Sequence, residues 1–138
     1  MTTTQQKYGI ETKVDLSYDD AIEKVTAALQ EEGFGVLTEI DVKATLKKKI
    51  DAEFRRYIIL GACNPHFAHR ALQAEIDIGM LMPCNVIVYE ADDGKTVVAA
   101  MDPGVRSRVS DNPELPKIAA DARERVERAI ASLGGQRT

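Results

Sequence analysis

The sequence contains no tryptophan, only two cysteines, and few aromatic side chains, which make up 5% of its 138 residues. A protein that stacks nucleic-acid bases needs aromatic platforms, and this composition supplies few of them. The formal net charge of −4 also argues against a general nucleic-acid binder, because such binding depends on neutralising phosphates. We therefore expect no nucleic-acid partner.

Long hydrophobic runs are also missing. None approaches the roughly 20 residues that a membrane-spanning helix requires. The N-terminal residues, MTTTQQKYG, lack the apolar segment of a secretory signal peptide. We therefore expect no membrane partner and a cytoplasmic location, where the two cysteines would be reduced thiols.

The composition is otherwise that of an ordinary globular protein, with 44% hydrophobic and 29% charged residues. The length suits one domain with a core of its own. We predict a single α+β domain over residues 7–135 and a disordered tail over residues 1–6. No internal repeat or linker interrupts the domain.

Hydrophobic periodicity predicts five strands and at least three helices. The strands are expected at residues 8–14, 34–40, 56–62, 84–90 and 96–101. Helices are expected from Ser17 to just before Gly33, from Pro65 to about residue 75, and from Asn112-Pro113 to about residue 133. Residues 41–51 are ambiguous, and their apolar spacing of four favours a short helix.

The resulting order is β-α-β-(α)-β-α-β-β-α, with Asp93-Gly94 as the turn of a hairpin between the last two strands. This order predicts an α+β fold, with a mainly antiparallel sheet of about five strands and helices packed on one face. The other face must meet solvent or a second subunit. Apolar residues occupy both sides of the strand over residues 86–89, so we expect a homodimer.

Both cysteines and both histidines lie between Gly61 and Cys84. Cys63 follows a predicted buried strand, Asn64 is suited to cap a helix, and Pro65 fits its first position. The amides at a helix N-terminus favour an anion, including a thiolate. We therefore expect Cys63 to be the more reactive thiol and to lie close to Cys84 at one end of the sheet.

This region, GACNPHFAHRALQAEIDIGMLMPCNVIVYE, and the preceding EIDVKATLKKKI resemble the bacterial and archaeal family called domain of unknown function 302 (DUF302). The resemblance covers nearly the whole domain. The matching positions are Cys63, Asn64, Pro65, Ala68, Ala71, Leu72, Pro83 and Cys84, and His66 lies outside the pattern. The resemblance implies a fold similar to half of the TATA-binding protein, without DNA binding, and a homodimer. It implies no activity.

The chemistry of this region leaves three alternatives. Cys63, His66, His69 and Cys84 are ligands that zinc accepts, although their spacing is not that of paired zinc knuckles. The two cysteines could instead be buried structural residues. A third possibility is a reactive thiol at Cys63 with His66 or His69 as its base, although no acidic residue is evidently placed to orient that histidine.

We therefore predict an uncharacterised binding module, a dimer that holds a small molecule, an anion or a metal ion. The candidate ligand-binding residues are Cys63, Asn64, His69 and Cys84. The alternative is a thiol-dependent enzyme or redox sensor that uses Cys63. The sequence identifies no cofactor.

Three further segments can each be interpreted either as functional or as ordinary surface or core residues. The basic segment Lys43, Lys47, Lys48, Lys49, Arg55 and Arg56 is either an anion-binding edge or a solvated helix face. Asp102, Arg106 and Arg108 fall in a predicted loop that could grip a carboxylate or phosphate, or be merely solvated. Met80, Leu81 and Met82 could line an adaptable pocket, fill the core or form a dimer interface.

Overall fold

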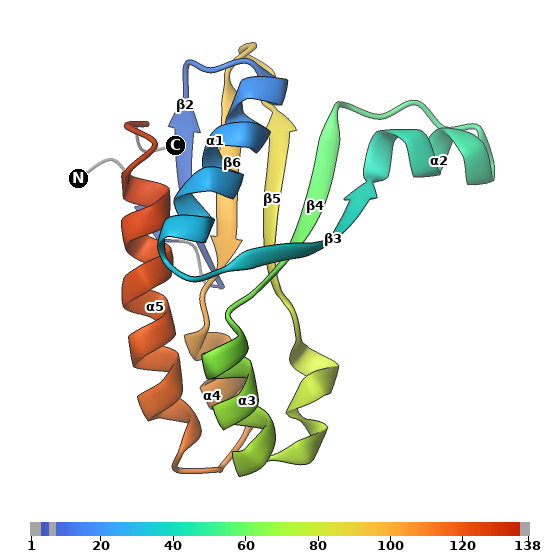
Figure 1. The fold of residues 1–138 in the computed structure, drawn as a ribbon. Helices are drawn as coiled ribbons and strands as arrows, with labels where there is room; N and C mark the ends of the chain where they lie inside the picture. The colour runs from blue at the N-terminus through green and yellow to red at the C-terminus, as the bar shows by residue number, and fades with distance from the viewer. Residues whose placement is uncertain (1–3, 6–7, 136–138) are drawn as a thin grey trace.

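A computed structural model describes residues 4–5 and 8–135 of the chain (Figure 1). Its strands form one antiparallel sheet in the order β1-β2-β6-β5-β4-β3. The strands are β1 (Thr4–Gln5), β2 (Gly9–Val14), β3 (Gly35–Asp41), β4 (Tyr57–Cys63), β5 (Cys84–Glu90) and β6 (Thr96–Met101). The helices are α1 (Tyr18–Glu31), α2 (Val42–Ile50), α3 (Pro65–Ala74), α4 (Gly104–Val109) and α5 (Leu115–Ala131), with a 3₁₀ helix η1 (Ile76–Leu81).

The predicted α+β class is confirmed, with five longer strands and helices on one face of the sheet. Figure 1 shows α1 and α5 lying across that face. Side chains from both helices and from the facing sides of the strands are almost fully buried between the two layers. They include Val25, Leu29, Val126, Ile130, Ile10, Leu60, Val86, Val88 and Val98. This layer is the main hydrophobic core, and its burial is the largest favourable contribution to folding.

Helix α1 begins and ends where the sequence predicts. Ser17 precedes it, and the Ser17 hydroxyl accepts a hydrogen bond of 3.1 Å from the backbone N–H of Asp20. Gly33 follows it with φ of 87°, a left-handed conformation that glycine adopts without strain. The chain then enters β3 directly.

The N-terminal residues differ in part from the sequence prediction. Of the six expected to form a tail, Thr4 and Gln5 form β1, which pairs with β2 through Glu11 and Ile10. The other four lie outside the described residues.

The loop predicted after Met101 contains a helix instead. Helix α4 occupies Gly104–Val109, and the Asp102 carboxylate accepts a 2.8 Å hydrogen bond from the N–H of Gly104 just before its first turn. The last helix also begins later than predicted, at Leu115. Asn112 accepts a hydrogen bond of 3.0 Å from the N–H of Glu114, so it stabilises the turn that precedes α5.

The second face of the sheet carries no helix among the described residues. A row of apolar residues crosses it in register, from Ile40 to Ile59, Ile87 and Ala99 on neighbouring strands. Ile40 is 49% exposed and the other three are partly exposed. We call these four residues the open-face row, because no helix of the described chain covers them.

The ambiguous segment is a helix, as the sequence favoured. Asp41 caps α2 by accepting a 2.9 Å hydrogen bond from the N–H of Ala44. No residue of α2 is buried, and the helix projects from the end of β3 away from the rest of the chain (Figure 1). We call residues 41–56 the arm. No helix in the described part of the chain is long and apolar enough to cross a membrane.

Candidate functional site

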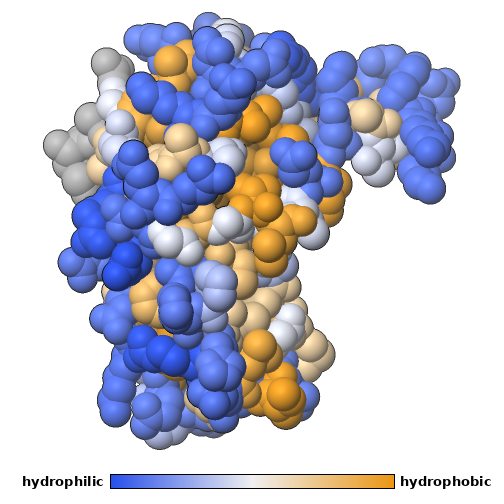
Figure 2. Space-filling view, in the orientation of Figure 1, coloured by the Kyte–Doolittle hydropathy of each residue, from blue (hydrophilic) through white to orange (hydrophobic). Residues whose placement is uncertain are grey.

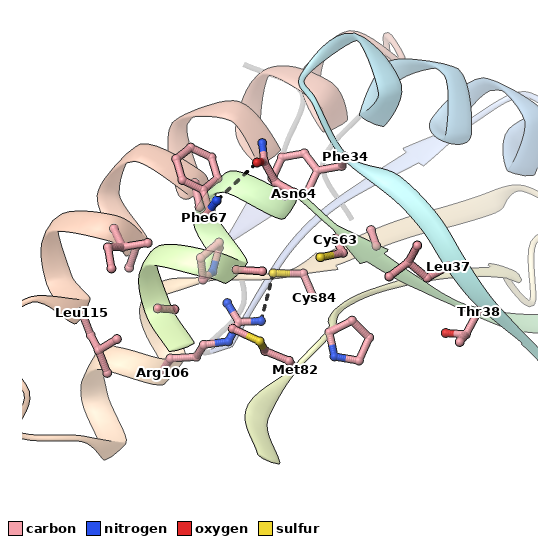
Figure 3. A pocket seen from close by; sticks show the side chains of 18 residues that line it. Phe34, Leu37, Thr38, Cys63, Asn64, Phe67, Met82, Cys84, Arg106 and Leu115 are labelled. Carbon is pink, nitrogen blue, oxygen red and sulfur yellow. Dashed lines mark hydrogen bonds between the residues drawn. The ribbon is translucent and has the colours of Figure 1, made fainter. Parts of the chain in front are cut away.

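A cavity of about 310 Å³ lies where one end of the sheet meets α3, α4 and α5 (Figure 3). Its wall is mostly apolar. The lining residues are Phe34, Leu37, Thr38, Ala62, Cys63, Asn64, Phe67, Ala68, Ala71, Met82, Pro83, Cys84, Pro103, Arg106, Leu115, Ile118, Ala119 and Ala122. In Figure 3 both cysteines and Arg106 lie between the β3 residues on one side and Phe67 and Leu115 on the other.

An irregularity in β3 shapes one side of the cavity. The pairing with β4 shifts register between Val36 and Thr38, so Leu37 is an extra residue on its strand. Such a bulge changes the direction of side chains near a strand edge. Leu37 and Thr38 both line the cavity, and Leu37 is 70% exposed. Figure 2 shows hydrophobic side chains at the molecular surface in this region.

Gly61 lets β3, β4 and the chain before β5 approach closely here. A Cβ at this position would overlap the Thr38 hydroxyl and come within 2.9 Å of Cγ of Pro83. Only glycine fits the space without a movement of its neighbours. Glycine at position 61 therefore allows Thr38 and Pro83, which both line the cavity, to lie where they do.

Asn64 positions α3 at the cavity. Its side-chain oxygen accepts hydrogen bonds from the backbone N–H groups of His66 and Phe67, at 3.1 and 3.4 Å. Its amide nitrogen donates to the carbonyl oxygen of Glu32 at 3.5 Å, which ties α3 to the end of α1. Asn64 lines the cavity, and these bonds direct its polar atoms toward the backbone.

Arg106 brings the one charged side chain among the described residues that line the cavity. It comes from α4, and its Nε donates a 2.9 Å hydrogen bond to the carbonyl oxygen of Leu81. Its Nη2 lies 3.1 Å from Sγ of Cys84 and donates to it. The sequence grouped Arg106 with Asp102 and Arg108. Arg108 is exposed and Asp102 is buried beside Arg123, so of the three only Arg106 lines the cavity.

Cys63 and Cys84 are both free thiols, partly buried in the wall of this cavity. Burial raises the pKa of the Cys63 thiol above its ordinary value; the Cys84 sulfur adds to this effect and the Arg106 guanidinium opposes it. The helix N-terminus that was expected to activate Cys63 is already capped by Asn64. A reactive thiol at Cys63 is therefore not favoured.

The histidines lie elsewhere. His66 and His69 are exposed on α3, and neither lines the cavity. Within residues 8–135 no three His, Cys, Asp or Glu side chains are grouped as a metal site would require. Cys63, His66, His69 and Cys84 are therefore not brought together as a ligand set, because both histidines are exposed and neither lines the cavity that holds the two thiols.

Of Met80, Leu81 and Met82, only one residue lines the cavity. Met82 lines the cavity, whereas Met80 is 83% exposed and Leu81 is 39% exposed on η1. The pocket interpretation therefore applies to Met82 alone.

Sequence reasoning missed the part of the wall that comes from α5. Leu115, Ile118 and Ala122 are apolar residues of the helix expected after Asn112-Pro113, and all three are buried. Ala119 and Ala122 of α5 nevertheless line the cavity together with Ala68 and Ala71 of α3. The signal that could have revealed the cavity is this concentration of alanine, because small side chains on facing helices leave volume unfilled.

The fold and the cavity define a small α+β protein with one antiparallel sheet, helices on one face and a mostly apolar cavity at one end. Residues 10–133 match the family described as Domain of unknown function DUF302, and the chain belongs to that family. The structure is similar to the crystal structure of an uncharacterized conserved protein DUF302 from Bacillus stearothermophilus, with a TM-score of 0.84 and 29% identity. The similarity covers 91% of this chain and 98% of the other. No curated protein matches the chain.

Proposed function

We propose that this protein is a binding module that holds a small molecule in the cavity beside Cys63 and Cys84. The cavity itself carries the proposal. Its volume of about 310 Å³ lies at the lower end of the roughly 300–1,000 Å³ range of ligand pockets. Its wall combines many apolar side chains with a few polar groups, as ligand sites do.

The unfilled volume supports the same conclusion energetically. Apolar side chains that face an empty space lose the dispersion contacts they would make with neighbouring atoms. Ile118, Ala119 and Ala122 are at least nine-tenths buried, yet they line a cavity. A ligand of matching shape recovers these contacts.

Mass spectrometry of the untagged protein under native conditions tests the proposal by detecting a ligand that copurifies or is captured from a metabolite mixture. A substitution that fills the cavity gives the control. Ala119→Leu should abolish capture and preserve stability, since its side chain takes up cavity volume. Ala120→Leu, on the exposed side of the same helix, should leave capture unchanged. Equal capture by both variants would contradict binding in this cavity.

We further propose that the module is a homodimer in the cytoplasm. The open-face row supports the dimer, because a second copy is the partner that would cover it. The arm supports it as well: residues 41–56 carry six basic and three acidic residues in a chain whose net charge is −4, so the arm of one copy is complementary to the acidic remainder of the other. Two cysteines present as free thiols are consistent with a reducing compartment.

A further inference from the structure

We propose that the ligand of this cavity is an amphipathic monoanion, with its carboxylate on Arg106 and its hydrocarbon part against the apolar side chains that line the cavity. This inference rests on the proposed function and adds the chemical class of the ligand. It starts from the placement of one cation in a wall that is otherwise uncharged.

The guanidinium of Arg106 has unused hydrogen-bonding capacity. Arginine carries five N–H donors, and here one goes to the carbonyl of Leu81 and one to the sulfur of Cys84. Neither partner is a carboxylate, and no Asp or Glu of the described residues forms an ion pair with Arg106. The remaining donors, including both on Nη1, are free to bind an acceptor in the cavity.

The charge of the site selects the charge of the ligand. A cation that is partly withdrawn from water is stabilised by an anionic partner, and a guanidinium suits a carboxylate because two parallel N–H groups meet two oxygens. With one cation in the wall, a single negative charge is balanced and a doubly charged phosphate is not. The Cys84 sulfur is only a weak hydrogen-bond acceptor.

The apolar part of the cavity determines the size and the hydrophobic character of the rest of the ligand. Ala71 of α3 packs with Leu115 and Ile118 of α5 in one hydrophobic cluster, and these side chains give the cavity an apolar wall. At the roughly 30 Å³ that one water molecule occupies in the liquid, about 310 Å³ holds about ten non-hydrogen atoms. Octanoate has this size and this division into a carboxylate and an alkyl chain, so it is the appropriate probe.

Isothermal titration calorimetry with octanoate and with 1-octanol tests the inference. The wild-type protein should bind octanoate more tightly than the neutral alcohol. Arg106→Gln should weaken octanoate binding at least about tenfold, the effect expected from loss of a charge-assisted hydrogen bond, and should change octanol binding little. Arg108→Gln removes an equal charge from the exposed side of α4 and should leave both affinities unchanged.

A second measurement uses the wild-type protein alone, so it does not depend on whether Arg106→Gln folds. In a pH titration of bound ¹³C-carboxyl octanoate followed by NMR, the carboxyl group should titrate at lower pH than it does free in solution, because the guanidinium favours its charged form. An unshifted titration would overturn the inference.

The two proposals can fail separately. Equal binding of octanoate and octanol, insensitive to Arg106→Gln, would reject the monoanion and retain the binding module. Absence of octanoate binding at millimolar concentration would also reject the monoanion, while ligand capture that Ala119→Leu abolishes would still support the module.

Discussion

Arg106 donates a hydrogen bond from Nη2 to Sγ of Cys84 across 3.1 Å, and so joins α4 to the first residue of β5. Burial raises the pKa of the Cys63 thiol, which acts against the higher reactivity expected of that residue.

We therefore predict that Cys84 is alkylated faster than Cys63 by iodoacetamide at neutral pH. Mass spectrometry of peptides after timed labelling measures both rates in one sample. Because the pKa of Cys63 is raised, its labelling rate should still be increasing with pH above the ordinary thiol value of 9.0. Faster labelling of Cys63 in the folded protein would show that the helix terminus outweighs burial.

Gly61 should be intolerant of even a methyl group. We expect Gly61→Ala to lower the free energy of unfolding by about 1–3 kcal/mol, the range for overpacking, because its Cβ meets both Thr38 and the stiff ring of Pro83. Chemical denaturation measures the difference.

Gly35→Ala is the matched control for that variant. Gly35 lies on the paired strand β3, and a Cβ there would have no neighbour within 4 Å. The change should shift stability by no more than about 0.5 kcal/mol. Equal losses in the two variants would show that flexibility, and not space, is what glycine provides at position 61.

Glu32 should make stability depend on pH in the acid range. Its carboxylate accepts hydrogen bonds from Arg128, the shortest of 2.9 Å, and this bonding holds the pKa of Glu32 below its ordinary value of 4.5. A lowered pKa contributes stability that is present above the unfolded value and is lost as the pH falls through the folded value.

Thermal unfolding of the wild type and of Glu32→Gln should therefore differ at pH 6–7 and converge as the pH falls below about 4. Glu31→Gln alters the exposed neighbour and should show no such convergence. If the difference in unfolding temperature between wild type and Glu32→Gln stayed constant over this pH range, the Glu32–Arg128 pair would make no pH-dependent contribution to stability.

The dimer proposal predicts a dimeric mass in light scattering at micromolar concentration. Ile87→Lys places a charge in the middle of the open-face row and should give a monomer. Gln30→Lys, on the exposed surface of α1, should remain dimeric. A stable interface buries about 1,200–2,000 Å² in total, more than four side chains supply, so the arm must contribute. A monomeric wild type would refute the proposal.

The sequence predicted the parts of this fold that local chemistry determines. Ser17 caps α1 and Gly33 follows its end, and residues 84–90 and 96–101 form strands with the predicted bounds, because turn residues and β-branched runs specify them. Arg106 was assigned to a loop because Asp102-Pro103-Gly104 is typical of a break, although Gly104 begins a six-residue helix.

Only the part of the candidate site around the two cysteines could be predicted from the sequence. Cys63 and Cys84 could be placed near one another because they bracket one strand-helix-strand unit. The part of the wall that comes from α5 could not be predicted. Ala119 and Ala122 lie on a helix far along the sequence, and apolar residues at this spacing are expected whether the helix faces a filled core or a cavity. His69 was selected for its chemistry, but its position on α3 directs it to solvent.

The exposure of α2 has a consequence for the motions of the chain. A helix of nine residues is too short to be stable by itself in water, and α2 buries no residue that would hold it to the sheet. Its remaining support is the Asp41 cap, the left-handed Asp51 at its other end and exposed pairs such as Lys47 with Asp51. Backbone amides of α2 should therefore exchange their hydrogens with solvent through local opening, long before global unfolding releases those of α1 and α5.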